Sequence, residues 1–272
     1  MIRDITLGQY YQGDSIVHKL DPRVKLIATI VYIISLFLYT NHVVVYGIAF
    51  LFLALCIFLS KVPVKFILRG LKAIVFLLLF TSVFNLFLTK GEPVFTLWKL
   101  TITKEGIVNS VFIAIRLMLL IVGSSLMTLT TTPNQLTDGL EKLLKLLQKI
   151  RVPVHEIAMM MSIALRFIPI LLEETDKIMK AQMARGADFE SGNLFKKIKA
   201  MVPLLVPLFI SAFRRANDLA MAMEARCYQG GDGRTKMKPL IYKKRDAFAY
   251  LVLALYLVVL CLAGKYMMLS IF

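Results

Sequence analysis

Two short triplets each contain an arginine that could bind a carboxylate of a partner. Ala184-Arg185-Gly186 and Ala225-Arg226-Cys227 each stand at the expected end of a long helix. A guanidinium presents a planar fork of donors, which can bind a carboxylate through two parallel hydrogen bonds. The flanking alanines leave room for close approach, and Gly186 allows the chain to turn off its helix. The alternative is a cation that merely suits the dipole at a helix C-terminus.

No other residues form a recognisable catalytic or metal-binding arrangement. His155-Glu156 begins like a zinc-protease helix, but Met159 stands where the second histidine is needed. A phosphate-binding loop ending in Lys-Ser or Lys-Thr is missing, and no expected membrane span contains a pair of acids for proton transfer. The sequence therefore predicts neither catalysis nor a cofactor. The cysteines follow no metal or disulfide spacing and lie at Cys56, Cys227 and Cys261.

The composition restricts the elements that can position these arginines. The 272 residues are 58% hydrophobic, with a mean hydropathy of +0.72, and 33 Lys and Arg against 17 Asp and Glu give a net charge of +16. So apolar a chain excludes an ordinary soluble domain and a disordered one. A basic nucleic-acid-binding protein is excluded by long apolar runs free of charge, which predict an all-α polytopic membrane protein.

About five membrane-spanning helices are expected, and the basic residues between them predict their direction. Residues 1–25 and the 61–72 loop each contain four Lys or Arg, whereas the 40–42 turn contains none. Because basic loops stay on the cytoplasmic side, the N-terminus is predicted to lie in the cytoplasm and the protein in the plasma membrane. The expected spans are 26–40, 43–60, 73–89, 107–129 and 247–264.

Three regions follow: a four-span region over 1–131, a coupling-helix region over 132–246, and a last transmembrane helix within 247–272. The middle region should open with a capping box at Thr132 and Gln135.

Two long amphipathic helices are then expected, at about 153–185 and 194–228. Their apolar halves, 157–172 and 200–213, could be read as spans. A crossing would put the basic 186–199 link outside, so a position at the cytoplasmic interface is favoured.

Together with Asp21-Pro22-Arg23 before the first span, the two triplets resemble the transmembrane T component of energy-coupling factor (ECF) transporters. The resemblance covers essentially the whole chain. It implies a non-catalytic scaffold that joins two ABC-type ATPase subunits to a membrane-embedded S component, for uptake of vitamins or other micronutrients. It also implies that both triplets dock the ATPases, with Arg185 and Arg226 as the docking arginines. Cys227 stands where many relatives have glycine.

Other residues have a functional and a structural interpretation. Flexible thioethers at Met159, Met160 and Met161 could contact varied S components, or only fill gaps between helices. Pro203 and Pro207 share a helix face and permit a hinge, or a simple bend around the spans.

Arg116 lies within the fourth span, where an unpaired arginine is costly. Backbone carbonyls or an acid from elsewhere must stabilise it, either for function or as a structural tie. The remaining expected partner is membrane lipid, bound by basic residues before the last span.

A substrate-conducting permease of a conventional ABC importer is the alternative function. The segment from Glu224 to Gly230 loosely resembles the coupling loop of such permeases, although it has arginine in the third place. A permease of that kind normally has one coupling loop rather than two arginine-tipped helices. An intramembrane enzyme is the less favoured third class, because the catalytic arrangements are missing.

Overall fold

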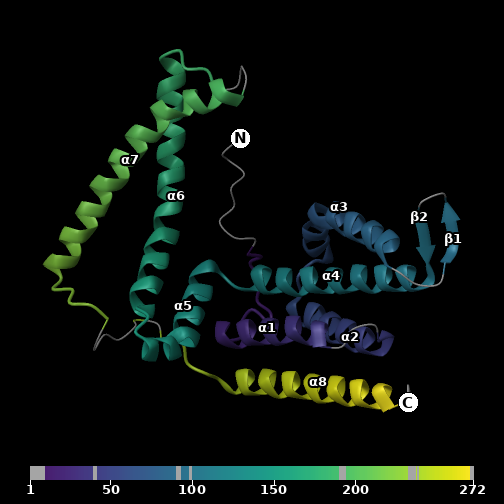
Figure 1. The fold of residues 1–272 in the computed structure, drawn as a ribbon. Helices are drawn as coiled ribbons and strands as arrows, with labels where there is room; N and C mark the ends of the chain where they lie inside the picture. Colours follow the sequence, from purple (N-terminus) through teal and green to yellow (C-terminus); the bar gives the residue numbers. More distant parts are fainter. Residues whose placement is uncertain are drawn as a thin grey trace. The chain divides into compact units, whose positions relative to one another are not determined.

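The structure is a computed structural model, and it describes residues 10–38, 42–89, 93–97, 100–189, 194–231, 237 and 239–269. Figure 1 shows its elements in chain order. They are α1 (Pro22–Leu38), α2 (Val43–Ser60), α3 (Val64–Leu88), β1 (Pro93–Leu97), β2 (Leu100–Thr103), α4 (Lys104–Thr130), α5 (Pro133–Leu144), the 3-10 turn η2 (Lys145–Ile150), α6 (Val154–Ala184), α7 (Leu194–Ala225) and α8 (Lys244–Leu269). The fold is that of an all-α polytopic membrane protein, as predicted.

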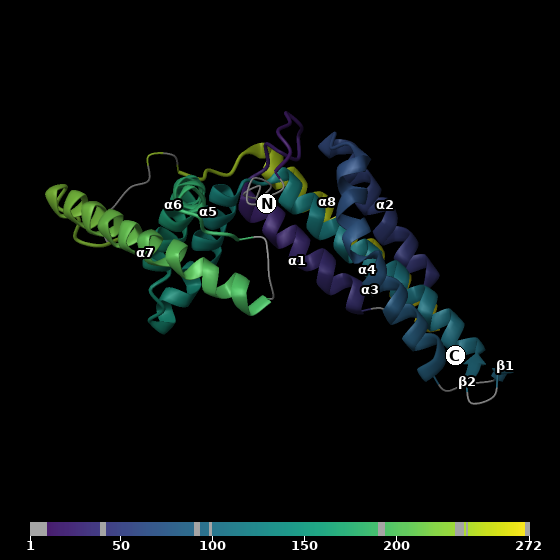
Figure 2. The same ribbon diagram turned by 90° about the horizontal axis from the view of Figure 1, so that it is seen from above.

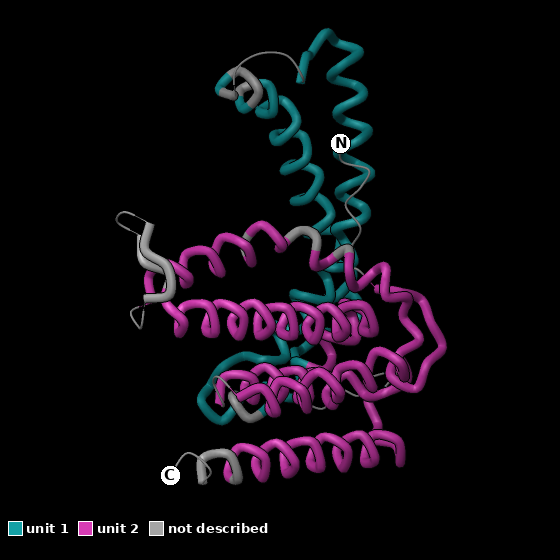
Figure 3. The backbone as a smooth tube through the Cα atoms, turned by 90° about the vertical axis from the view of Figure 1, so that its right-hand side faces the viewer, with its two compact units in different colours: residues 1–7, 140–239 teal, residues 8–139, 240–272 magenta. Residues whose placement is uncertain are grey.

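The helices belong to two compact units (Figure 3). The described parts of 8–139 and 240–272 form unit 2, and those of 140–239 form unit 1. Within unit 2, α1, α2, α4 and α8 lie side by side in both ribbon views (Figures 1 and 2). Unit 1 contains the two long helices α6 and α7.

Each of the five expected spans corresponds to a described helix. Among the described residues, α2, α4, α6 and the Lys244–Lys265 part of α8 are long and apolar enough to cross a membrane. The first expected span matches α1, which has 17 residues, and the third matches the apolar Ile74–Leu88 part of α3. Residues 39 and 40, at the end of the first expected span, lie outside the described residues. For α6, the predicted interfacial position stays a prediction.

A β-hairpin occupies part of the segment between the third and fourth expected spans, 73–89 and 107–129. Strands β1 and β2 pair antiparallel, with Leu97 opposite Leu100. The Thr103 hydroxyl then accepts the Gly106 amide at 3.1 Å and donates to the Thr89 carbonyl at 2.9 Å. This N-cap begins α4 directly after β2 and links the start of α4 to the end of α3.

The core of unit 2 is aromatic at the contact of α1, α2, α4 and α8. The rings of Phe52 and Tyr256 stack with centroids 4.3 Å apart, and the Tyr256 hydroxyl lies 2.7 Å from the Ser35 hydroxyl. Tyr32 packs beside them. A Cβ at Gly123 would meet the Tyr32 ring at 2.8 Å, so glycine is required for α4 to approach α1 this closely.

The start of α1 is tied to the start of α8 by polar contacts. Asp21 caps the helix by accepting a hydrogen bond from the Arg23 amide at 2.9 Å, and Pro22 occupies the first helical position. The Arg23 guanidinium binds the Asp21 carboxylate through two nitrogens and lies 3.9 Å from the Tyr242 ring centroid. Asp246, at the start of α8, accepts the Asp21 amide at 2.8 Å. The polar partners of Arg23 among the described residues therefore lie within the protein.

Lys25, in the first turn of α1, is buried. Its Nζ donates to the Thr130 carbonyl at 2.8 Å and to the His18 carbonyl at 3.2 Å, which joins α1 to the end of α4. The His18 ring has its own partners: Nε2 donates to the Tyr11 carbonyl, so Nδ1 accepts from the Ser15 hydroxyl. Burial lowers the pKa of the His18 ring, because it disfavours the charged form.

Candidate functional site

The first arginine triplet forms the C-terminal cap of α6. Arg185 follows the last helical residue, and Gly186 has a left-handed backbone with φ +87°. The Gly186 amide donates to the Met183 carbonyl at 2.9 Å, and the Ala187 amide donates to the Gln182 carbonyl at 3.0 Å. These two hydrogen bonds define a Schellman motif.

The second triplet forms the same cap at the end of α7. Cys227 is left-handed, with φ +53°. Its amide donates to the Glu224 carbonyl at 2.8 Å, and the Tyr228 amide donates to the Met223 carbonyl at 3.1 Å. The predicted helix end at residue 228 was three residues too late, because Cys227 reverses the chain after Arg226. Thus a cysteine adopts here the conformation that a glycine adopts in the first triplet.

Both triplets place their residues in equivalent positions. Ala184 and Ala225 are the last helical residues, and Arg185 and Arg226 are the cap residues. Both arginines are exposed, and neither side chain has a polar partner within the described part of the chain. The last turn of each helix contains no basic residue, so each helix end has its positive charge on the cap arginine alone. Each guanidinium is free to bind an external carboxylate.

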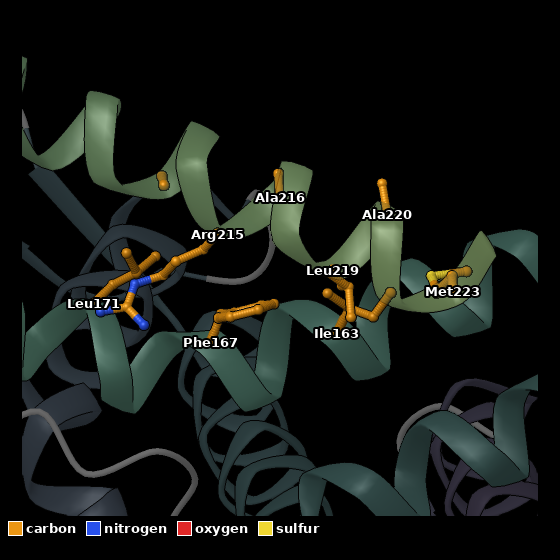
Figure 4. A pocket seen from close by; sticks show the side chains of 9 residues that line it. Ile163, Phe167, Leu171, Arg215, Ala216, Leu219, Ala220 and Met223 are labelled. Atoms are coloured by element: carbon orange, nitrogen blue, oxygen red, sulfur yellow. The ribbon is translucent and has the colours of Figure 1, made fainter. Parts of the chain in front are cut away.

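The two arginines lie at opposite ends of an antiparallel helix pair. In Figure 4, Leu171 of α6 lies opposite Arg215 of α7, and Ile163 lies opposite the stretch of α7 from Leu219 to Met223. Later residues of α7 therefore face earlier residues of α6. Between the helices is an open, mainly apolar groove of about 270 Å³. Its lining consists of Ile163, Phe167, Leu171, Ala212, Arg215, Ala216, Leu219, Ala220 and Met223.

The methionine cluster and the proline pair lie on different parts of this helix pair. Met160 and Met161, near the start of α6, are 58% and 42% exposed, and Met159 is half-buried. Pro203 is exposed and Pro207 half-buried in the first half of α7. Because the helices are antiparallel, the structure does not bring the methionines and the prolines together. Each group is available separately as a contact surface.

Arg116 finds partners that the sequence did not suggest. Its Nε donates to the Tyr46 hydroxyl at 2.8 Å. The guanidinium carbon lies 5.6 Å from the Phe37 ring centroid and 5.9 Å from the Tyr46 ring centroid. A phenol and two aromatic faces thus take the place of the expected carbonyl or acid. The arrangement ties α4 to α1 and α2.

The remaining candidates for a site among the described residues are side chains that could bind a metal ion. Among these residues, no three His, Cys, Asp or Glu side chains gather where they could hold a metal ion. The described part of the chain therefore offers its two arginine-tipped ends and its apolar helix faces as sites for partners.

Comparison with known proteins shows the family of the chain. A family model described as cobalt transport protein, CbiQ, matches residues 13–237. The energy-coupling factor transporter transmembrane protein EcfT of Clostridium kluyveri is 58% identical over 253 residues, which cover 92% of this chain and 93% of the relative. The EcfT of Acidaminococcus fermentans is 55% identical over 254 residues, covering 93% and 94%. That of Bacillus subtilis is 49% identical over 247 residues, covering 90% and 93%. The chain thus belongs to the cobalt transport protein family, as a transmembrane component of the energy-coupling factor transporters.

Proposed function

We propose that this chain is the non-catalytic coupling subunit of an ECF importer. It joins two cytoplasmic ABC-type ATPases to a membrane-embedded, substrate-capturing S component, for uptake of vitamins or other micronutrients. The observation that carries this proposal is the pair of identical caps, each presenting one exposed arginine at an end of the α6–α7 pair. An arginine fork suits a carboxylate on a partner surface, and two equivalent forks suit two similar partners.

The spacing of the arginines supports two ATPases rather than one. Arg185 and Arg226 each lie 11 residues beyond the point where Glu174 of α6 binds Arg215 of α7. At 1.5 Å per residue, each arginine is about 16 Å along its own helix from that contact. The helices run in opposite directions, so the two guanidinium groups are separated by roughly 30 Å. One docking pocket cannot receive both, whereas two subunits with equivalent pockets can.

The exposed apolar face of α7 supports a position at the cytoplasmic membrane interface. Its apolar segment 200–213 exposes large apolar side chains, among them Phe209 at 67% and Phe213 at 62%. A continuous face of this kind is unfavourable in water and must be covered by lipid or by another protein. We assign it to lipid and to the S component, together with Met159, Met160, Met161, Pro203 and Pro207. The basic 1–25 and 61–72 segments support an N-terminus in the cytoplasm.

Co-purification from membranes tests the assignment directly. The tagged wild-type chain should bring down two ATPases and a small membrane protein. Changing both Arg185 and Arg226 to Glu should release the ATPases and abolish uptake. Arg214→Glu, which reverses an exposed arginine on the same helix, is the matched control and should leave binding unchanged. Retention of both ATPases and normal uptake by the double variant would refute docking at the caps. Recovery of a second permease copy would favour a conventional ABC importer.

A further inference from the structure

The contact between α6 and α7 contains one two-pronged polar bond. Glu174 of α6 accepts a hydrogen bond from the Ser211 hydroxyl at 2.7 Å, through Oε1. Its other oxygen, Oε2, accepts from Nη2 of Arg215 at 2.5 Å. Both carboxylate oxygens are therefore held by α7. Among the described residues this is the one ion pair that joins the two long helices. Glu174, Ser211 and Arg215 are named the crossing cluster below.

The ion pair of the crossing cluster is equally far, in residues, from the two arginine tips. Glu174 precedes Arg185 by 11 residues, and Arg215 precedes Arg226 by the same number. The segments 174–186 and 215–227 also share alanines at equivalent places and end in the same Schellman motif. Each helix therefore extends about 16 Å from the cluster to its tip. The two extensions have equal length and point in opposite directions.

Apolar packing alone does not fix how α6 and α7 are aligned. Beside the Glu174–Arg215 ion pair, the contact is the open groove of about 270 Å³. Half of the residues with which α7 lines it are alanines, at positions 212, 216 and 220. Apolar contacts have no preferred direction, so they define the alignment of two helices less sharply than a directional polar bond does. A carboxylate held through both oxygens has a defined direction and distance. Among the described residues, the crossing cluster is therefore the contact between α6 and α7 that has a defined direction through an ion pair.

We propose that the crossing cluster is the pivot of the helix pair, which sets the separation of the two tips and transmits the displacement of one tip to the other. Glu174, Ser211 and Arg215 are positioning residues in this proposal, because they act through Arg185 and Arg226 and touch no ATPase. The proposal rests on the proposed function, in which the tips dock the ATPases. It adds that binding of the ATPases and coupling between them depend on different residues.

Glu174→Gln separates these two properties. The amide retains the shape and the acceptor for Ser211 but loses the charge that binds Arg215. We expect both ATPases to co-purify as with the wild type, while the uptake per ATP hydrolysed in proteoliposomes falls at least fivefold. Glu173→Gln, a change at the exposed neighbouring acid, is the matched control and should have no effect. The exchange Glu174→Arg with Arg215→Glu should recover most of the coupling.

Spin labels beside the tips measure the geometry without the ATPases. With labels at exposed positions 188 and 229, the wild-type distance distribution should be narrow, and Glu174→Gln should broaden it at least twofold. Ser211→Ala, which removes one bond only, should broaden it less. Unchanged coupling and an unchanged distribution in Glu174→Gln would overturn the proposal, as would loss of the ATPases from that variant. If the wild type itself binds no ATPase, docking fails, while the distance measurement still tests the pivot.

Discussion

Exchanging the residues at the two left-handed cap positions should change the two helix ends in opposite directions. Gly186 and Cys227 occupy equivalent places in two Schellman motifs, with φ +87° and φ +53°. Gly186→Cys puts a side chain where the structure has glycine, and Cys227→Gly removes one where the structure has cysteine. The pair is thus an internal comparison within a single chain.

The expected size follows from the backbone and not from contacts. A residue with a Cβ pays roughly 1–2 kcal/mol to adopt the left-handed conformation, whereas glycine adopts it without steric cost. No atom lies within 4 Å of a Cβ built on Gly186, so a clash adds nothing to the cost there. Glycine also has greater freedom in the open chain, which offsets part of the gain. The free energy of opening each cap should therefore change by about 1 kcal/mol. This corresponds to roughly a fivefold change in the equilibrium constant for opening of the helix end.

Hydrogen exchange at the cap amides measures this change. The Ala187 and Tyr228 amides close the two motifs, and their exchange reports opening of the helix ends. Gly186→Cys should speed exchange at the first cap about fivefold, and Cys227→Gly should slow it at the second by a similar factor. Cys227→Ala is the control and should give no protection, because alanine retains the Cβ. Slower exchange in Gly186→Cys, or equal protection by alanine and glycine at position 227, would refute the reasoning.

Three further contacts can be tested by substitutions whose effect is measured as the midpoint of thermal unfolding in detergent. Thr132→Ala removes one half of the reciprocal cap of α5 and should destabilise the chain by about 1 kcal/mol; an unchanged midpoint would argue against this cap. Tyr46→Phe leaves the Arg116 Nε without its acceptor and should cost about 1–3 kcal/mol, whereas equal stability would mean that the bond is replaced. A Cβ at Gly231 would lie 2.2 Å from the His155 ring, so Gly231→Ala should lower the midpoint. His155→Ala should relieve that loss in the double variant, and strict additivity would contradict the clash.

The parts of the fold that depend on local signals could be predicted from the sequence. The second expected span and α2 have the same bounds, 43–60, because charged or polar residues flank a run of apolar ones. The predicted capping box is present: the amide of Thr132 donates to the Gln135 side chain, and the Gln135 amide donates to the Thr132 hydroxyl, each at 3.3 Å. Helix α6 was predicted within one residue at each end. Such signals lie within a few residues of the feature that they specify.

Local signals also explain two of the errors. The end of α7 was predicted too late because Cys227 is not a residue type that marks a left-handed cap, whereas Gly186 is. The hairpin at 93–103 was overlooked although Val94, Phe95 and Ile102 are typical strand residues. A search for β-branched and aromatic alternation in that loop would have found it.

The polar partners of the membrane helices could not be predicted in the same way. Lys25 binds the carbonyl of Thr130, 105 positions away, and Arg116 binds Tyr46, 70 positions away. Such pairs depend on how neighbouring helices are rotated and aligned. Local patterns in one sequence do not reveal the rotation or the alignment. The binding of Glu174 by Arg215 depends on the antiparallel alignment of α6 and α7 in the same way.

The cap geometry also decides what the arginine triplets have in common. A glycine in the third place is not the shared feature, because Cys227 supports the same hydrogen bonds as Gly186. The shared feature is an arginine placed between the last helical residue and a left-handed residue, where the chain turns away and leaves the guanidinium exposed. A basic residue in the last helical turn would interact with the helix dipole as favourably as one at the cap. Both last turns nevertheless lack a basic residue, and the arginine stands at the cap. Two helices that keep the same exposed cap, at equal distances from one ion pair, are better explained by two equivalent partners than by the stability of each helix alone.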